Sequence, residues 1–462
     1  MASNAEQVGV DLGITIGVTG LLPRWTVSPW GAMFAWGREP QEMREHAGPG
    51  TESERPTLDW FVAADDRWHV PADEPTVRQR RIEGTPVVET RVRVPDGDAV
   101  QRVWAVPELG GCMVVEFEND SPMPFAVAVV ASGARVLTER APAAVEIQGI
   151  DLPDDAILLP IGHRATVRVL VPAADAGGHR FVAVPPAMSV VRGWTHVTER
   201  ASRLVLPDES LVEALTAARC DLLLEGPVDA AIDPVGFLLD VAELVRCGDD
   251  AASWLLDIVA PTELVGRDHS DSPDRRTALD AARFVARRAG DERAARDIER
   301  MIEPRRGRRT ARTVAASTES VAAGDDVSFA GLRRSESVGR FVRGIERRLV
   351  RHTAGDTGSD TAALLPAGFP VGWLGSNFEV HQVPAASTTA VSFAIRWHGE
   401  RPAVLWEQHG APMRLTAPAI DSSWETHEAI GEALLAAPAA PRSATLSVTS
   451  IADVDPDGGS FA

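Results

Sequence analysis

The amino-acid sequence predicts an α+β multidomain protein in which two strand-rich regions flank a helical one. Residues 1–200 repeatedly alternate apolar and polar side chains between turn residues, and this alternation returns after residue 361. Between these regions, apolar residues recur at three- and four-residue spacing behind helix-capping residues. We therefore expect an N-terminal antiparallel β-sandwich domain (1–200), a central α-helical hairpin domain (205–351), a small C-terminal antiparallel β-sandwich (362–452) and a disordered acidic tail (453–462).

The N-terminal alternation is clearest in residues 88–94, where Val and Thr alternate with Glu and Arg. Such alternation gives a strand one apolar and one charged face. Pro95-Asp96-Gly97-Asp98 supplies turn residues before an apolar run resumes. Further strands are expected at 100–106, 113–118, 125–131, 145–147, 156–159 and 165–171. Closely spaced strands with polar turns are typical of an antiparallel sandwich.

The helical region begins after Pro207. Asp208 can cap a first helix, and Asp233-Pro234 combines a cap with proline at the first helical position. Gly248 can end that second helix, and Asp249 or Asp250 can start a short one. Further helices are expected at 276–289, 292–302 and 331–351. The region would thus contain about six helices arranged as antiparallel hairpins.

Strands return in the C-terminal part, after a linker expected at 352–361. In residues 391–398, Val391, Phe393, Ile395 and Trp397 would lie on one face, opposite polar and small residues. Additional strands are expected at 403–408, 413–416 and 444–451. The central and C-terminal patterns complete the β, α, β order.

Composition limits the classes of function. The net charge of −20 among 462 residues argues against nucleic-acid or anionic-membrane binding, because the overall field repels phosphate. The amino-terminal residues lack a signal-peptide pattern, and no apolar run reaches the roughly 18 residues that cross a bilayer, so a cytoplasmic location is expected. The absence of Lys and Tyr is typical of a GC-rich genome.

Cofactor and metal sites are not expected. Cys112, Cys220 and Cys247 are widely separated, which suggests buried reduced thiols rather than disulfides or a zinc ribbon. Four histidines (His381, His398, His409 and His427) lie in the C-terminal part, but they lack the short spacing that fixes two metal ligands on one element. The sequence also lacks a Walker loop, a Rossmann glycine motif after a strand, and a G-x-S-x-G elbow.

The β, α, β order resembles bacterial six-hairpin, glucoamylase-like glycosidase-related proteins. The segments V-V-E-F-E-N-D-S-P-M-P-F-A-V-A-V-V (114–130) and R-W-H-G-E-R-P-A-V-L-W-E (396–407) are similar to sandwich strands of such proteins. The resemblance implies an α-glucan or glycosyl-conjugate ligand, and hydrolysis by paired carboxylates if the protein is catalytic. A complete toroid needs about twelve helices of ordinary length, so the central domain would be a partial α-toroid. No catalytic residue is transferred.

Four residues of the Trp-rich C-terminal region are candidates for an oligosaccharide site. Trp373 and Trp424 lie in turn-rich sequence, and Glu379 and Glu425 lie close to aromatic residues. An indole can stack on a sugar ring while a carboxylate binds hydroxyl groups. Strand alternation instead assigns Trp397 and Trp406 to the core and turns Glu407 away from Trp406.

The alternative is a non-enzymatic protein-interaction scaffold. An arginine-rich segment follows the helix expected at 292–302 and could bind an acidic partner. Its candidate contacts are Arg305, Arg306, Arg308, Arg309 and Arg312. A deep pocket lined by two carboxylates and by Trp373 or Trp424 would favour the enzyme, whereas a shallow helical face would favour the scaffold.

Overall fold

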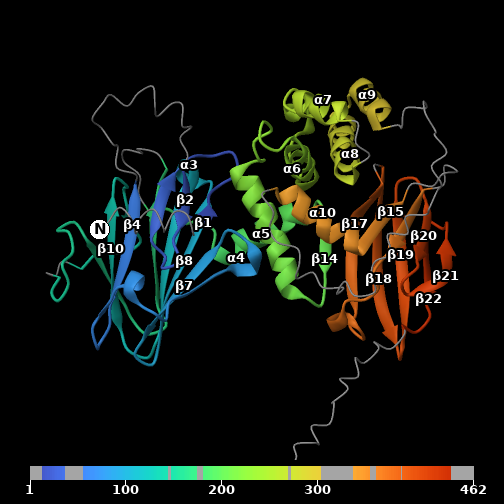
Figure 1. Ribbon diagram of the computed structural model, residues 1–462. Coiled ribbons are helices and arrows are strands. Elements are labelled where there is room, and N and C mark those ends of the chain that lie inside the picture. Colours follow the sequence, from blue (N-terminus) through green and yellow to red (C-terminus); the bar gives the residue numbers. More distant parts are fainter. Residues whose placement is uncertain are drawn as a thin grey trace, which may run out of the picture.

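The computed structural model describes residues 13–36, 56–143, 147–173, 181–268, 272–302, 337–353, 360–386 and 388–438. It confirms an α+β fold in which mainly antiparallel sheets flank a helical region. In Figure 1 the N-terminal sheets and the C-terminal sheets lie at opposite ends of the molecule, and α4 and α5 lie between them. The arginine segment 305–312 and the strand expected at 444–451 lie outside the described residues, as does most of the strand expected at 145–147.

The N-terminal region is a sandwich of two sheets. The first contains β1 (Ile14–Ile16), β2 (Arg24–Val27), β3 (Met33–Trp36), β4 (Thr57–Ala63), β10 (Phe125–Ser132) and β12 (Ile157–Ile161), with β5 (Trp68–His69) paired to β4. The second has the order β11 (Leu137–Thr138), β13 (Thr166–Val171), β9 (Cys112–Asp120), β8 (Gly97–Val106), β7 (Val88–Val94) and β6 (Arg78–Arg81). The short α3 (Glu108–Gly111) joins β8 to β9.

Alternation determines which side chains fill this sandwich. On β4, Leu58, Trp60 and Val62 are fully buried, whereas the residues between them are only partly buried. The ring of Trp60 meets that of Phe117 from the opposite sheet at a centroid distance of 5.6 Å. Two inner faces that interdigitate in this way form one continuous apolar core, which is what stabilises a β-sandwich.

The outer face of the second sheet carries a network of ion pairs around Glu89. This carboxylate lies on β7, is 2% exposed, and accepts hydrogen bonds from Arg91 and Arg102 at 3.1 and 2.8 Å. Burial opposes its charge, but the hydrogen bonds from Arg91, Arg102 and Arg80 outweigh burial and lower the pKa of Glu89 from 4.5 to about 2.

This lowered pKa predicts a pH-dependent stability. Because the folded pKa lies below the unfolded one, the contribution is complete above pH 4.5 and is lost as the pH falls toward about 2. Its size is up to about 3 kcal/mol of unfolding free energy. Urea unfolding followed by Trp fluorescence should show that Glu89→Gln destabilises at pH 7 and flattens this acid dependence. The exposed Glu139→Gln serves as a control and should change neither.

The helical region contains α5 (Glu209–Glu225), α6 (Pro234–Cys247), α7 (Val259–Arg267), α8 (Pro273–Arg288), α9 (Glu292–Ile302) and α10 (Val338–Leu349), with a 3-10 turn at Ala251–Trp254. Two predicted caps are confirmed. Asp208 accepts a hydrogen bond from the amide of Leu211, and Asp233 accepts one from the amide of Gly236. Gly248 ends α6 in the left-handed region at φ 110°, where glycine is favoured.

Two expectations about secondary structure are wrong, one about the type of an element and one about where a helix ends. Residues 187–198 form a helix, α4 (Ala187–Thr198), within the region expected to contain strands. The last helix ends at Leu349 rather than 351, because Val350–Thr353 forms β15 and pairs with β16 (Thr361–Leu364). Pairing with a neighbouring strand satisfies the backbone of these residues, so the expected linker begins in a sheet.

The C-terminal module is a second sandwich. Its five-stranded sheet, called the C sheet here, has the order β14 (Arg203–Val205), β17 (Phe378–Ala386), β18 (Thr389–His398), β19 (Arg401–His409) and β22 (Ile430–Leu434). The opposing sheet has the order β15, β16, β20 (Arg414–Ala417) and β21 (Asp421–Thr426). Because β16 and β20 run parallel, this sheet is mixed, and the expectation of a purely antiparallel C-terminal sandwich is wrong on this point. Because β14 precedes α5 in the chain, the C sheet includes a strand from before the helical region.

Candidate functional site

The structure does not bring the four predicted ligand residues together. Trp373 lies in the core, and Glu379 lies on the outer face of the C sheet. Trp424 and Glu425 lie on β21 of the opposing sheet, where Glu425 pairs with Arg414 at 2.6 Å. These residues therefore do not line one shared surface.

The tryptophans of this module are mainly structural. Trp373 is 4% exposed and packs against Phe378 at a centroid distance of 5.1 Å, so its indole is not available for stacking on a sugar. Trp406 is buried, as strand alternation predicted, and the partly buried Trp424 meets it edge-on at 5.4 Å. Trp397 is also partly buried, and its indole N–H donates to the carbonyl of Ser376.

Glu379 belongs to a small polar cluster with His381 and Arg396. Its carboxylate contacts the guanidinium of Arg396 and lies 3.0 Å from Nε2 of His381. Hydrogen bonds from Arg396, and then from His381, lower the pKa of Glu379. A carboxyl group held in its charged form is poorly suited to donate a proton at neutral pH, so Glu379 is not suited to act as a general acid.

A groove of about 300 Å³ lies among the ends of three helices. It is lined by Pro234 and Val235 at the start of α6, Leu264 and Val265 on α7, Asp268 just after α7, and Ser272, Asp274 and Arg275 at the start of α8. This helical groove combines one apolar wall with two carboxylates and a guanidinium. Its volume is at the lower end of the range for small-molecule sites.

Local chain chemistry explains how the polar side of the helical groove forms. Ser272 caps α8 by accepting a hydrogen bond from the amide of Asp274 at 3.2 Å, and Pro273 occupies the first helical position. This cap fixes Asp274 in the first turn. Arg275 is held by the carbonyl of Met301 at 2.9 Å, and its buried Nε has no partner among the described residues.

Sequence reasoning did not select the residues of the helical groove. The available signal was the helix start at Ser272-Pro273-Asp274, with Asp268 close before it in the chain. Only packing of α6 against α7 and α8 places an apolar wall opposite these aspartates. A cap in the sequence does not reveal that wall.

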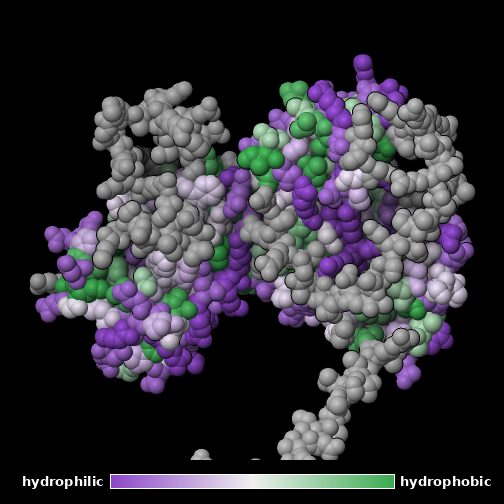
Figure 2. Space-filling model, in the orientation of Figure 1, coloured by the Kyte–Doolittle hydropathy of each residue, from purple (hydrophilic) through white to green (hydrophobic). Residues whose placement is uncertain are grey.

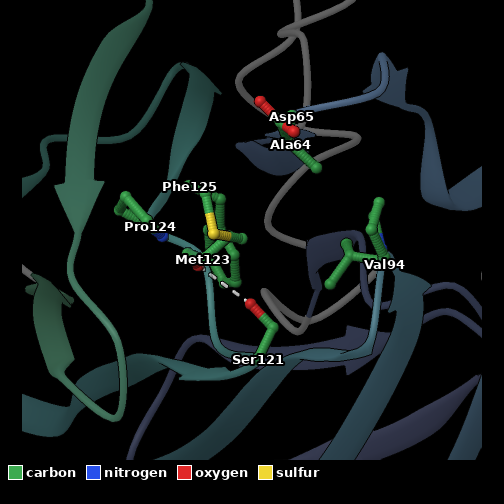
Figure 3. Close-up of a pocket in the computed structure, with 8 residues that line it drawn as sticks. Ala64, Asp65, Val94, Ser121, Met123, Pro124 and Phe125 are labelled. Atoms are coloured by element: carbon green, nitrogen blue, oxygen red, sulfur yellow. Dashed lines mark hydrogen bonds between the residues drawn. The ribbon is translucent and has the colours of Figure 1, made fainter.

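A second hollow, shown in Figure 3, lies in the N-terminal sandwich and is too small for an organic ligand. Its volume is about 10 Å³, and its lining includes Asp65, Ser121 and Met123. Ser121 donates a hydrogen bond to the carbonyl of Met123 at 2.9 Å. A space of this size holds about one water molecule.

Metal and thiol chemistry receive no support in the described part of the chain. No group of three His, Cys, Asp or Glu side chains is arranged to hold a metal ion among those residues. The three cysteines are buried and unpaired. Burial raises the pKa of both Cys112 and Cys247 to about 12, which keeps these thiols protonated at neutral pH.

The lengths and polarity of the helices can be compared with the thickness of a lipid bilayer. Within the described ranges, each helix is too short or too polar to span a bilayer.

Comparison with known proteins gives a weak structural likeness. No family model matches the chain, and no curated protein matches it. Among solved structures, the chain is similar to one described as "Putative kojibiose phosphorylase from human microbiome", at 6% sequence identity and a TM-score of 0.37. The match covers 93% of this chain and 97% of that one. A TM-score this low does not establish a common fold, so no residue role is transferred.

Proposed function

We propose that this protein binds carbohydrate, with one sugar unit seated in the helical groove between α6, α7 and α8. The observation that supports this proposal is the composition of the groove: two carboxylates and a guanidinium opposite an apolar wall, in about 300 Å³. Sugars present hydroxyl groups along their edges and C–H groups on their faces. Carboxylates accept hydrogen bonds from the former, and aliphatic side chains pack against the latter.

Each polar group has a defined part in this proposal. Asp268 and Asp274 accept hydrogen bonds from neighbouring hydroxyl groups, and the guanidinium of Arg275, which lines the same groove, donates to a sugar oxygen. Leu264 is 54% exposed at the mouth and offers apolar surface to the ring. The proposed function is binding; hydrolysis would additionally require the two carboxyl groups to flank a glycosidic bond.

Maltotriose, an α-glucan oligosaccharide, is the probe for this proposal. Saturation-transfer NMR should detect it bound to the wild-type protein. Asp274→Asn should raise the dissociation constant about tenfold, because a hydrogen bond to a charged group contributes about 1.5–3 kcal/mol. The double variant Asp268→Asn/Asp274→Asn should abolish the signal. Asp257→Asn removes an exposed carboxylate of the same region outside the groove and should leave binding unchanged.

Equal transfer in the wild type and the double variant, or none in either, would contradict the proposal. A reducing-sugar assay on the same samples separates binding from hydrolysis.

If maltotriose does not bind the wild-type protein, a protein-interaction scaffold becomes the favoured function. That second candidate rests on exposed hydrophobic residues around α6 and α7, where Figure 2 shows apolar surface over the helices. These residues are Ile232 (79% exposed), Leu256 (86%), Val259 (49%) and Leu264.

A further inference from the structure

We propose that Ser392, His409 and Glu407 form a nucleophilic serine site that hydrolyses small carboxylic esters on the outer face of the C sheet. This site is separate from the helical groove and does not depend on carbohydrate binding. The proposal rests on the positions of three side chains from two different strands, which the pairing of those strands brings together.

Register and alternation place the three side chains on one face. Ser392 on β18 lies opposite Glu407 on β19, and His409 follows Glu407 by two residues. Val391 and Phe393, the neighbours of Ser392, are buried in the core, so Ser392 must face outward. The side chains of His409 and Glu407 are 37% and 54% exposed, so this outer-face serine site is open to solvent.

The Ser392–His409 distance matches a nucleophile and its base, and the Glu407 carboxylate lies near the other ring nitrogen without hydrogen-bonding to it. Ser392 Oγ lies 3.0 Å from His409 Nε2, which is hydrogen-bonding distance. His409 Nδ1 lies 3.7 Å from Glu407 Oε1. When Nδ1 carries the ring hydrogen, Glu407 faces that N–H and leaves Nε2 free to accept the serine proton. Glu407 is therefore a positioning residue.

A backbone donor fixes the position of the Ser392 hydroxyl. The register of β17 against β18 shifts between Val380 and Val383, and Gln382 within this bulge has φ 56°. A side chain in this left-handed region costs about 1 kcal/mol. The bulge directs the Gln382 N–H at Ser392 Oγ, at 3.0 Å. Because this N–H donates to Oγ itself, it holds the serine side chain beside His409 rather than forming an oxyanion hole.

The proposed reaction is acyl transfer to water. Ser392 Oγ attacks the ester carbonyl carbon while its proton passes to His409 Nε2. The tetrahedral adduct collapses with cleavage of the bond to the leaving alkoxide, which takes that proton and departs as an alcohol. Water then attacks the acyl-serine, His409 accepts the water proton, and carboxylic acid is released as Ser392 regains its proton. No oxidant, metal or cofactor is required.

The surroundings indicate a small acyl group. Ile430 lies opposite Glu407 on β22 and is 68% exposed, and Leu405 on the same outer face is 39% exposed. These side chains offer apolar contact to a short acyl chain without enclosing it. An open site of this kind favours small, reactive esters over long-chain ones.

A fluorophosphonate probe, which modifies activated serines, and p-nitrophenyl acetate test this proposal on the full chain. We expect the wild type to be labelled and to hydrolyse the ester, and Ser392→Ala to lose both activities. His409→Gln should slow labelling by about 100-fold, which is the usual scale of general-base assistance. Ser422→Ala, a matched control at an exposed serine of the other sheet, should react like the wild type.

The role of Glu407 has its own measurement. Glu407→Ala should slow labelling of Ser392, because His409 loses the acceptor oxygen beside Nδ1, whereas Glu407→Gln keeps an acceptor oxygen there and should restore labelling toward the wild-type rate. A purely structural role would leave the labelling rates of these two variants equal. Mass spectrometry of peptides from the labelled wild type identifies the modified residue without requiring any variant to fold. Label on Ser392 supports the proposal; no label, or label only on other residues, overturns it.

Discussion

Replacing Glu346 by Gln is expected to destabilise the protein by about 3–5 kcal/mol, the usual loss when one partner of a buried ion pair is removed. Glu346 on α10 is 1% exposed and accepts hydrogen bonds from Arg246 on α6 at 2.6 and 3.1 Å. It also accepts one from the Ser202 hydroxyl at 3.1 Å, and Arg219 lies 3.7 Å away. Without its charge, the buried arginines would share one remaining carboxylate, Glu243.

Urea unfolding monitored by Trp fluorescence measures this loss. The control is Glu263→Gln, which breaks the exposed Glu263–Arg267 pair on α7. Exposed pairs of this kind contribute about 0–1 kcal/mol. If Glu346→Gln and Glu263→Gln unfold with similar free energies, the buried network does not have the stabilising role assigned here.

The second large effect is expected for Gly339→Ala, at about 3 kcal/mol of destabilisation. A Cβ at Gly339 would lie 2.4 Å from the carbonyl carbon of Leu239 on α6. Asp240 holds this close approach by accepting hydrogen bonds from the Gly339 amide at 2.6 Å and the Ser337 hydroxyl at 2.8 Å. Because the obstructing atoms are backbone atoms, α10 would have to move away from α6.

Gly193→Ala on α4 provides the matched control, because a Cβ there meets nothing within 4 Å. Alanine favours helix over glycine by about 1 kcal/mol, so this control should be as stable as the wild type or more stable. Thermal unfolding of both variants separates helix propensity from steric overlap. A Gly339→Ala protein at least as stable as the wild type would exclude close packing of α10 against α6.

Local sequence signals predicted the regular elements well where the local pattern and the tertiary environment agree. The strand at 88–94 and the helices that Asp208 and Asp233 cap are confirmed. Alternation over 391–397 also assigned Val391, Phe393 and Ile395 to the buried face. These patterns are readable because one face of each element must be apolar to be buried.

The candidate sites depended on contacts between distant parts of the chain. The buried charges around Glu346 come from three helices, and the helical groove requires three helices to converge. The pairing of β14 with β17 joins residues on opposite sides of the helical region. No local pattern encodes these juxtapositions, because each residue alone has the appearance of an ordinary surface charge or helix cap.

The Trp- and His-rich C-terminal module shows the same contrast between local sequence pattern and tertiary contact. The sequence by itself determined that this region forms strands, which face of β18 is buried, and that Glu407 turns away from Trp406. Only the tertiary structure decided that Trp373 enters the core and that His409 meets Ser392. The physical reason is that alternation fixes the face of a side chain, whereas strand register and packing between sheets fix its neighbours.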